Sequence, residues 1–118
     1  MTRHDVRHES LGARGEALAE AFLREAGYKI VGRNIRLPPG ELDVVAAHGD
    51  CLCFIEVKCR RHEPGESFLS STKQRRMRLL ARWYLEKWPW AGFVRFDVIG
   101  IEWPPGAAPR VTHIVEAF

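Results

Sequence analysis

Acidic and basic side chains interrupt two apolar stretches of this 118-residue sequence. Glu41 and Asp43 follow Gly40, and Glu56 and Lys58 alternate with apolar residues further along the chain. Two facing carboxylates repel each other unless a cation lies between them, and Mg²⁺ prefers carboxylate oxygens together with water and phosphate oxygens. A lysine beside such a pair can orient the attacking water or stabilise the charge of a phosphoryl transition state. Asp43, Glu56 and Lys58 therefore indicate metal-dependent hydrolysis of a phosphodiester.

A β-hairpin would bring these two stretches together. Residues 41–47 and 51–60 have strand composition, and residues 48–50, with the sequence His-Gly-Asp, suit a tight turn. Side chains alternate along a strand, so Glu56 and Lys58 share one face of the second strand. We expect the opposite face of the hairpin to be buried and to comprise Leu42, Val44, Ile55 and Val57.

The register of this hairpin decides whether Asp43 joins Glu56. Pairing of Ala47 with Leu52, or with Asp50, places Asp43 on the Glu56 side of the sheet. A slip by one residue would bury Asp43 among apolar neighbours, which is unfavourable. The sequence therefore predicts one of the two favourable registers. The alternative interpretation is that these charged residues belong to an ordinary solvated sheet face.

Two helices are predicted to flank the strands. The first covers residues 10–26, with Ser10 as its cap, Gly27 as its stop signal and one side made small by Gly12, Gly15, Ala19 and Ala26. The second follows a polar loop over residues 61–71 and ends before Pro89. Its apolar residues at helical spacing are Met77, Leu80, Ala81, Tyr84, Leu85 and Trp88.

Further strands are predicted at residues 28–36, 93–102 and 110–116. The order α-β-β-β-α-β-β predicts an α/β fold with a mixed sheet of about five strands flanked by helices. Arg95 and Asp97 are expected to form a structural rather than a catalytic pair. No Gly-rich phosphate loop follows a strand, which argues against enzymes with nucleotide cofactors.

Length and composition predict a single domain over residues 1–118, with residues 1–9 as a flexible tail. No apolar run approaches the roughly 20 residues that cross a bilayer, and the start lacks the apolar stretch of a signal peptide. We therefore expect a cytoplasmic protein without a membrane partner. Cys51, Cys53 and Cys59 are odd in number and closely spaced, which argues against a disulfide framework.

Positive charge is concentrated in one part of the chain. The formal net charge is +3, but residues 58–87 contain nine lysines and arginines against three acidic residues. This distribution favours a phosphate-rich partner, although a solvated helix face would have a similar composition. The candidate nucleic-acid-binding residues are Arg60, Arg61, Lys73, Gln74, Arg75, Arg78 and Arg82.

Several short segments, taken together, resemble one known family. They are residues 12–19, 33–36, 40–43, 54–58 and 95–98, together with Lys73. The chain resembles the YraN-like family of the restriction-endonuclease-like PD-(D/E)xK nuclease superfamily, and it is similar to archaeal Holliday-junction-resolvase-like proteins. The resemblance implies a restriction-endonuclease-like core, DNA as partner, and Mg²⁺ or Mn²⁺ as cofactor. It also implies that Asp43, Glu56 and Lys58 take the nuclease positions and that Glu16, from the first helix, joins Asp43 and Glu56 as a catalytic and metal-binding acid.

The sequence leaves three functions open. The first is a metal-dependent endonuclease that acts on DNA, including branched or structured DNA. The second is a nucleic-acid-binding module that keeps the nuclease fold without cleaving. The third is a dimeric scaffold of the same fold, and a homodimer is compatible with the sequence under all three.

Overall fold

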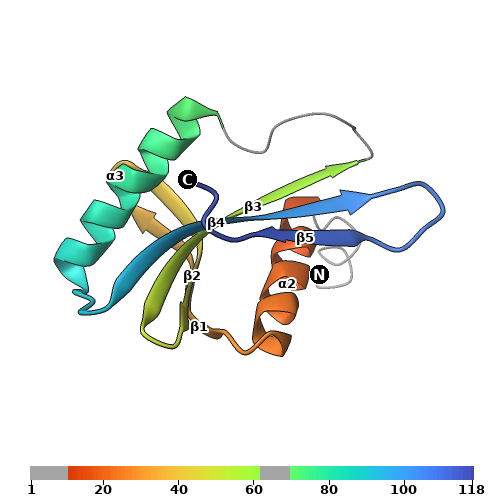
Figure 1. The fold of residues 1–118 in the computed structure, drawn as a ribbon. Coiled ribbons are helices and arrows are strands. Elements are labelled where there is room, and N and C mark those ends of the chain that lie inside the picture. Colours follow the sequence, from red (N-terminus) through yellow and green to blue (C-terminus); the bar gives the residue numbers. More distant parts are fainter. Residues whose placement is uncertain (1–10, 62–69) are drawn as a thin grey trace, which may run out of the picture.

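The computed structural model describes residues 11–61 and 70–118 (Figure 1). The predicted tail over residues 1–9, the predicted cap Ser10 and most of the predicted loop lie outside these ranges. The elements are α2 (Leu11–Glu25), β1 (Lys29–Leu37), β2 (Gly40–His48), β3 (Cys51–Arg61), α3 (Ser71–Lys87), β4 (Phe93–Trp103) and β5 (Arg110–Ile114). The predicted order α-β-β-β-α-β-β is confirmed.

The five strands form one mixed sheet in the spatial order β1-β2-β3-β4-β5. Only the central β3–β4 pair is parallel among the described strands, because α3 carries the chain back across the sheet before β4 begins. The helices α2 and α3 lie on opposite faces of the sheet (Figure 1). None of the helices in the described ranges is long and apolar enough to cross a membrane.

Each face of the sheet has its own hydrophobic core. Beneath α2 the core contains Ala19, Leu23, Val44, Ala46, Cys53, Ile55, Val57, Ile99 and Ile101. Beneath α3 it contains Leu37, Leu42, Val45, Leu52, Phe54, Leu80, Ala81 and Tyr84. Because both faces of the central strand β3 are covered, this strand reads as a nearly continuous apolar run in which Glu56 and Lys58 stand out.

Cap residues determine where the helices begin and end. Gly27 has a φ of 93° and follows α2, as predicted, while the amide of Tyr28 donates to the carbonyl of Leu23 at 2.9 Å. Ser70 begins α3 because its hydroxyl accepts the Lys73 amide at 3.2 Å. The predicted loop extends to residue 71, so the helix begins one residue earlier than predicted.

The buried face of α3 matches the predicted apolar stripe except at its last position. Met77, Leu80, Ala81 and Tyr84 are buried, whereas Trp88 is 44% exposed. Trp88 has a φ of −130° and a ψ of 88°, so the chain has already left the helical path at this residue. Trp88 therefore does not join the buried face of the helix.

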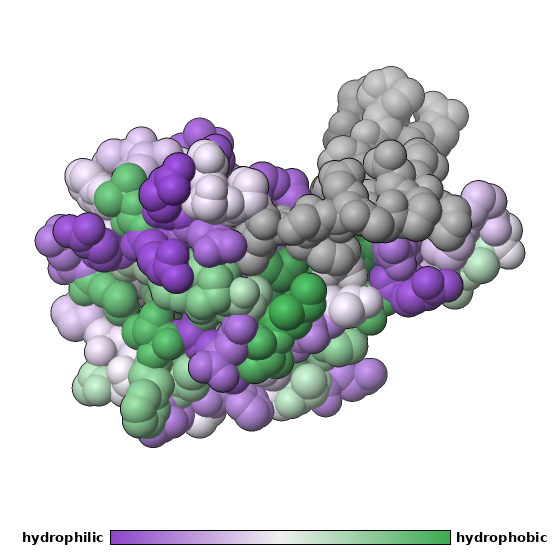
Figure 2. Space-filling model, turned by 45° about the horizontal axis from the view of Figure 1, so that its top comes forward, coloured by the Kyte–Doolittle hydropathy of each residue, from purple (hydrophilic) through white to green (hydrophobic). Residues whose placement is uncertain are grey.

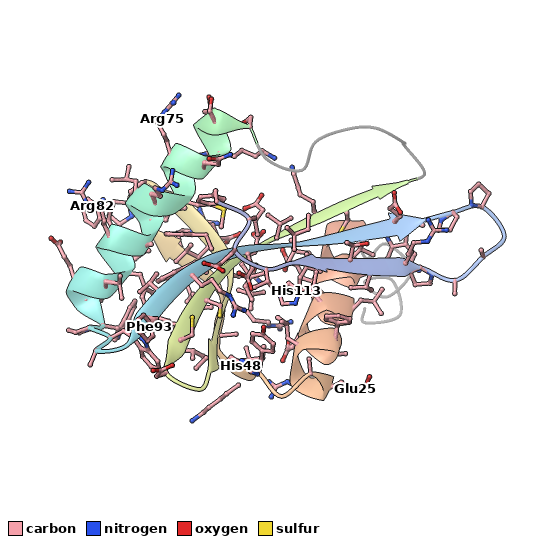
Figure 3. The ribbon with its side chains drawn as sticks, viewed as in Figure 1. Glu25, His48, Arg75, Arg82, Phe93 and His113 are labelled. Carbon is pink, nitrogen blue, oxygen red and sulfur yellow. The ribbon has the colours of Figure 1, made fainter. Side chains whose placement is uncertain are left out.

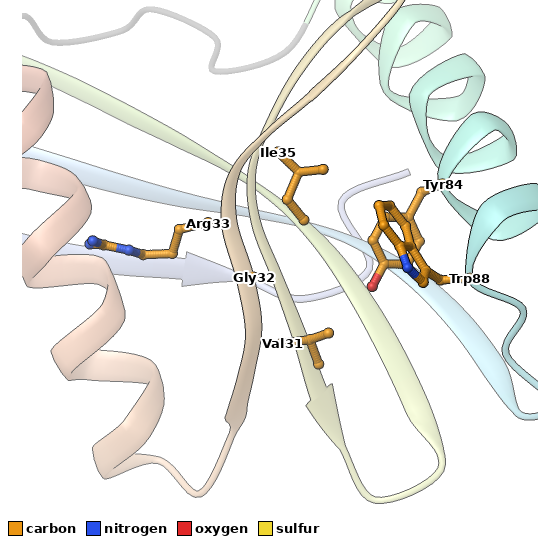
Figure 4. A pocket seen from close by; sticks show the side chains of 6 residues that line it. All are labelled: Val31, Gly32, Arg33, Ile35, Tyr84 and Trp88. Carbon is orange, nitrogen blue, oxygen red and sulfur yellow. The ribbon is translucent and has the colours of Figure 1, made fainter.

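A rotation in β1 and β2 changes which side chains face which helix. Asn34 has a positive φ of 50° and lies between Arg33 and Ile35, which pair with Val44 and Leu42. As a result, Arg33 points toward α2 and Ile35 toward α3, although strand alternation would place both on one face (Figure 4). The partner strand follows the same rotation. Leu42 lies in the α3-side core and Val44 in the α2-side core, so the prediction that they share one buried face was wrong.

Close packing between α2 and β3 depends on one glycine. A Cβ atom at Gly15 would overlap the sulfur of Cys59, and Ala19, one turn later, is fully buried. The predicted small side of the helix is therefore real at Gly15 and Ala19. It was wrong at Gly12 and Ala26, which are exposed, and Ala26 lies just beyond the last residue of the helix.

The Gly15–Cys59 contact gives a first prediction. Gly15→Ala should lower the free energy of unfolding by about 1–3 kcal/mol, because the new methyl group meets the Cys59 sulfur. In a Cys59→Ala background the same change should be neutral or stabilising, because alanine favours the helix once the sulfur is gone. Urea unfolding of the four proteins in this double-mutant cycle measures the coupling, and additive effects would contradict the contact.

Candidate active site

Asp43 lies where the pairing of β2 with β3 ends. The ladder runs from His48 and Cys51 to Val44 and Ile55, and it includes the predicted Ala47–Leu52 pair. Beyond Val44 the backbone amide of Val57 donates to Oδ2 of Asp43 at 2.9 Å. The carboxylate therefore takes a place that a strand carbonyl would otherwise occupy, in the gap between the two strands.

This position makes Asp43 electrostatically unusual. Burial raises the pKa of its carboxyl group to about 7, and the hydrogen bond from Val57 only partly opposes this rise. The negative charges of Glu56, Glu16 and Glu41 raise the pKa further. Asp43 is thus surrounded by acidic groups from β2, β3 and α2.

Glu56 and Lys58 occupy the α3 side of β3. Their strand neighbour Phe54 packs in the core beneath α3, and alternation along β3 places Glu56 and Lys58 on the same side. Lys73, from the first turn of α3, reaches the same place. Its pKa lies below the usual lysine value because the adjacent Lys58 side chain and partial burial both disfavour its charged form. Two lysines therefore stand beside Glu56.

Glu16 approaches the same region from α2. It is half-buried, and its charge raises the pKa values of both Asp43 and Cys59. Burial is the main cause of the raised pKa of the Cys59 thiol. These interactions place Glu16 near Asp43 and Cys59.

The acidic side chains do not form a closed metal cage. Among the described residues, no group of three or more His, Cys, Asp or Glu side chains is arranged to hold a metal ion. Mg²⁺ does not require such a cage, because it commonly binds one or two protein carboxylates and completes its coordination with water and substrate phosphates. The pair Asp43 and Glu56 fits that donor set.

A basic stripe on the solvent side of α3 consists of three of the candidate residues, Arg75, Arg78 and Arg82. Arg75 and Arg82 project away from the sheet (Figure 3), and all three arginines of the stripe are exposed. Arg78 also lies over the ring of Phe118, at 4.8 Å from its centroid. On the face shown in Figure 2, hydrophilic and hydrophobic residues are interspersed. Gln74 is half-buried in the first turn of the helix, while the side chains of Arg60 and Arg61 lie outside the described part of the structure.

A salt titration tests this stripe. Changing Arg75, Arg78 and Arg82 together to glutamine should flatten the slope of log affinity for DNA against log salt by about 2 to 3, since each phosphate contact contributes about 0.9. The matched control changes three exposed bases elsewhere, Arg24, Lys29 and Arg110. Fluorescence anisotropy measures both slopes. Equal slopes in the two variants would show that the stripe is ordinary solvated surface without phosphate contacts of its own.

Arg95 and Asp97 form a buried network on the α2 side of the sheet. Asp97 is fully buried and accepts hydrogen bonds from Arg95 at 2.9 and 2.8 Å and from the amide of Glu116 at 3.1 Å. Nε2 of His113 lies 2.8 Å from the same carboxylate, and Arg95 also donates to the Tyr28 hydroxyl at 2.7 Å. This network ties β4 to β5 and to the start of β1, in agreement with the expected structural role.

An apolar pocket lies away from the acidic residues. It has a volume of about 500 Å³ and lies between β1 and the end of α3 (Figure 4). Its lining consists of Val31, Gly32, Arg33, Ile35, Tyr84 and Trp88. Because no carboxylate lines this pocket, it does not contribute to the candidate active site.

Comparison with known protein families shows to which family the chain belongs. Residues 15–101 match the model of the uncharacterised protein family UPF0102, which is more than half of the sequence. The chain belongs to this family. The matched region of the UPF0102 chain includes Glu16, Asp43, Glu56, Lys58 and Lys73.

Individual UPF0102 relatives align over nearly the whole chain. The UPF0102 protein of Rhodococcus opacus is 46% identical over 114 residues, covering 92% of this chain and 96% of that protein. The UPF0102 protein of Cytophaga hutchinsonii is 40% identical over 99 residues, covering 81% and 88%. Among solved structures, the Holliday junction resolvase Hjc of Archaeoglobus fulgidus aligns with 24% identity and a TM-score of 0.47, covering 84% of this chain and 74% of Hjc.

Sequence reasoning missed one residue that shapes the site of this UPF0102 chain. Asn34 lies across from Asp43 in the β1–β2 ladder, and its positive φ accompanies the rotation of both strands. An asparagine inside a strand pattern is the available signal, because asparagine adopts positive φ more readily than most other residues. That signal indicates that side chains stop alternating regularly between the two faces of the sheet. It does not show which face the following side chains take.

Proposed function

We propose that this UPF0102 chain is a metal-dependent endonuclease that hydrolyses DNA phosphodiester bonds, with branched or structured DNA as its substrate. Asp43, Glu56 and Glu16 are the proposed metal-binding and catalytic acids, and Lys58 is the proposed catalytic base or charge stabiliser. The expected metal is Mg²⁺, with Mn²⁺ as its substitute.

The surroundings of Asp43 are the observation that carries this proposal. Its carboxyl group is partly buried, it has a pKa of about 7, and Glu56, Glu16 and Glu41 add negative charge around it. A protein gains nothing in stability from crowding acids in this way, and a divalent cation would relieve the repulsion. Functional sites are where such unfavourable charge arrangements are commonly found.

Each proposed residue has a distinct task. The Val57 amide holds the Asp43 carboxylate at the gap between β2 and β3, and Glu56 would supply the second carboxylate for Mg²⁺. Bound Mg²⁺ would neutralise charge that develops on the phosphate oxygens. Lys58 would donate a hydrogen bond to the attacking water or to a non-bridging phosphate oxygen. Lys73, which lies beside Lys58, would add positive charge for the phosphate.

The basic stripe supports DNA as the substrate. Lys73 lies in the first turn of helix α3, beside Glu56, and the helix continues with Arg75, Arg78 and Arg82 on its solvent side. A phosphate backbone that passes along this helix would deliver one phosphate to the acids at the start of the helix.

A cleavage assay tests the proposal directly. Purified protein should cut at least one member of a panel of single-stranded, duplex, flap and four-way DNA substrates when Mg²⁺ or Mn²⁺ is present, and none with EDTA. Products with defined ends on a sequencing gel would identify endonucleolytic cleavage. Absence of cleavage on every substrate, with DNA binding retained, would favour the non-catalytic binding module instead.

A further inference from the structure

Trp83 is a large aromatic side chain that the hydrophobic core does not use. It lies on α3 and is 42% exposed, as is Leu79 one turn earlier. The buried face of the same helix is formed by Met77, Leu80, Ala81 and Tyr84. The exposure of Trp83 therefore calls for an explanation other than core packing.

Trp83 lines two hollows on the surface. One has a volume of about 360 Å³ and lies between α3 and the turn that joins β1 to β2. A second, of about 200 Å³, lies farther along the outer side of α3 and includes Leu79 and Arg82 in its lining. Trp83 and Glu86 line both hollows, so the Trp83 side chain borders open space in each of them. The larger hollow is within the size range of small-molecule sites.

Positive charge surrounds these hollows. Arg36, whose side chain is 84% exposed, and Lys87 line the larger one, and Arg82 lines the smaller one. The lining of both hollows contains a single acidic residue, Glu86. An aromatic ring with three basic neighbours suits a ligand that combines flat rings with phosphates.

An ion pair beside the β1–β2 turn joins the lining of the larger hollow to a neighbour of Asp43. Arg36 lies 3.6 Å from the Glu41 carboxylate, and Glu41 precedes Asp43 by two residues. Along α3, ten residues separate Lys73 from Trp83, which corresponds to about 15 Å at 1.5 Å per residue. Bases stacked 3.4 Å apart would span that distance in about four to five nucleotides.

We infer that Trp83 stacks against an unpaired base of the DNA substrate, while Arg36, Arg82 and Lys87 contact the flanking phosphates. This inference rests on the proposed function and specifies its substrate class as DNA with unpaired bases about four to five nucleotides from the scissile phosphate. A perfect duplex keeps its bases paired and stacked inside the helix, so Trp83 would distinguish flaps and other DNA with unpaired bases from duplex DNA.

Binding in EDTA tests this inference without requiring cleavage. The probes are a labelled DNA flap and a labelled duplex of equal length, and 2-aminopurine is placed in the flap strand. Wild-type protein should bind the flap about tenfold more tightly than the duplex and should quench the 2-aminopurine fluorescence. Trp83→Ala should remove both effects and leave duplex affinity within about twofold, whereas Trp83→Phe should keep most of the preference.

Phe93→Ala is the matched control, because Phe93 is an aromatic side chain that is 70% exposed at the start of β4 and lines neither hollow. Equal flap affinity of wild type and Trp83→Ala would overturn the inference, and so would a wild type that binds neither DNA. A change of oligomeric state in Trp83→Ala, measured by sedimentation, would also overturn it by showing that a second copy of the chain covers the ring. If wild type prefers the flap through Trp83 but never cleaves, the inference stands and the proposed endonuclease function fails. If wild type cleaves DNA while Trp83→Ala has the same flap affinity as wild type, the proposed endonuclease function stands and the inference about Trp83 fails.

Discussion

Asp43→Asn and Glu56→Gln are each expected to reduce Mg²⁺-dependent DNA cleavage by about 1000-fold. Each change removes one negative charge from the proposed donor pair for Mg²⁺ while keeping the size of the side chain. Affinity for DNA in EDTA should stay level or increase, because a group that repels phosphate becomes neutral. Single-turnover cleavage and metal-free anisotropy measure the two effects separately.

Lys58→Ala should reduce cleavage to a similar extent for a different reason. The acids that bind the metal remain, but the water or the transition-state charge loses its basic partner. Metal binding, measured by calorimetry, should therefore survive in Lys58→Ala and weaken in Asp43→Asn.

Suitable controls lie far from the acidic cluster. Glu25→Gln changes an exposed carboxylate at the far end of α2 (Figure 3), and Lys29→Ala changes an exposed lysine at the start of β1. Both controls should cleave like wild type. Full activity of purified Asp43→Asn and Lys58→Ala would show that these residues are not the catalytic centre.

Metal-free protein should become less stable as the pH rises from about 4 to 7, and Asp43 is the expected cause. The pKa of its carboxyl group is about 7 in the folded chain, against an ordinary value of 3.8. The folded state therefore binds more protons than the unfolded state in this range, and its stability falls as pH increases. A pKa shift of this size corresponds to roughly 4 kcal/mol, and solvent screening reduces the effect. Asp43→Asn should therefore raise the free energy of unfolding at pH 8 by about 2 kcal/mol.

Urea unfolding in EDTA at pH 5 and pH 8 measures this effect. The difference between wild type and Asp43→Asn should be large at pH 8 and small at pH 5, where Asp43 is protonated in the folded state. Adding Mg²⁺ at pH 8 should stabilise wild type and leave Asp43→Asn nearly unchanged. A pH dependence that is the same in both proteins would show that Asp43 is not held in an unfavourable environment.

The sequence predicted the elements well because each has local signals. Gly27 ends the first helix, the apolar spacing of Met77, Leu80 and Ala81 marks the second, and the His-Gly-Asp turn sets the Ala47–Leu52 register. Register could be predicted because a slip by one residue exchanges buried and exposed side chains along the whole strand. These signals depend only on near neighbours in the chain.

Features set by tertiary contacts could not be predicted in the same way. The rotation at Asn34 places Leu42 and Val44 on different faces, and strict alternation gave the wrong face for Leu42. The hydrogen bond from the Val57 amide to Asp43 depends on where the β2–β3 ladder stops. The closeness of Lys73 to Lys58 depends on how α3 packs on the sheet. The sequence identified these residues as candidates, but their arrangement depends on packing between distant segments.

The parallel pairing of β3 with β4 has a consequence for the order of folding during synthesis. Strands β1, β2 and β3 pair with their sequence neighbours, so these hairpins can form as soon as they leave the ribosome. The β4 partner of β3 emerges only after α3, and until then one edge of the strand that bears Glu56 and Lys58 is unpaired. A nascent chain thus contains the candidate catalytic residues well before it can hold them in place, and hydrolysis of nucleic acid by incomplete chains is not expected.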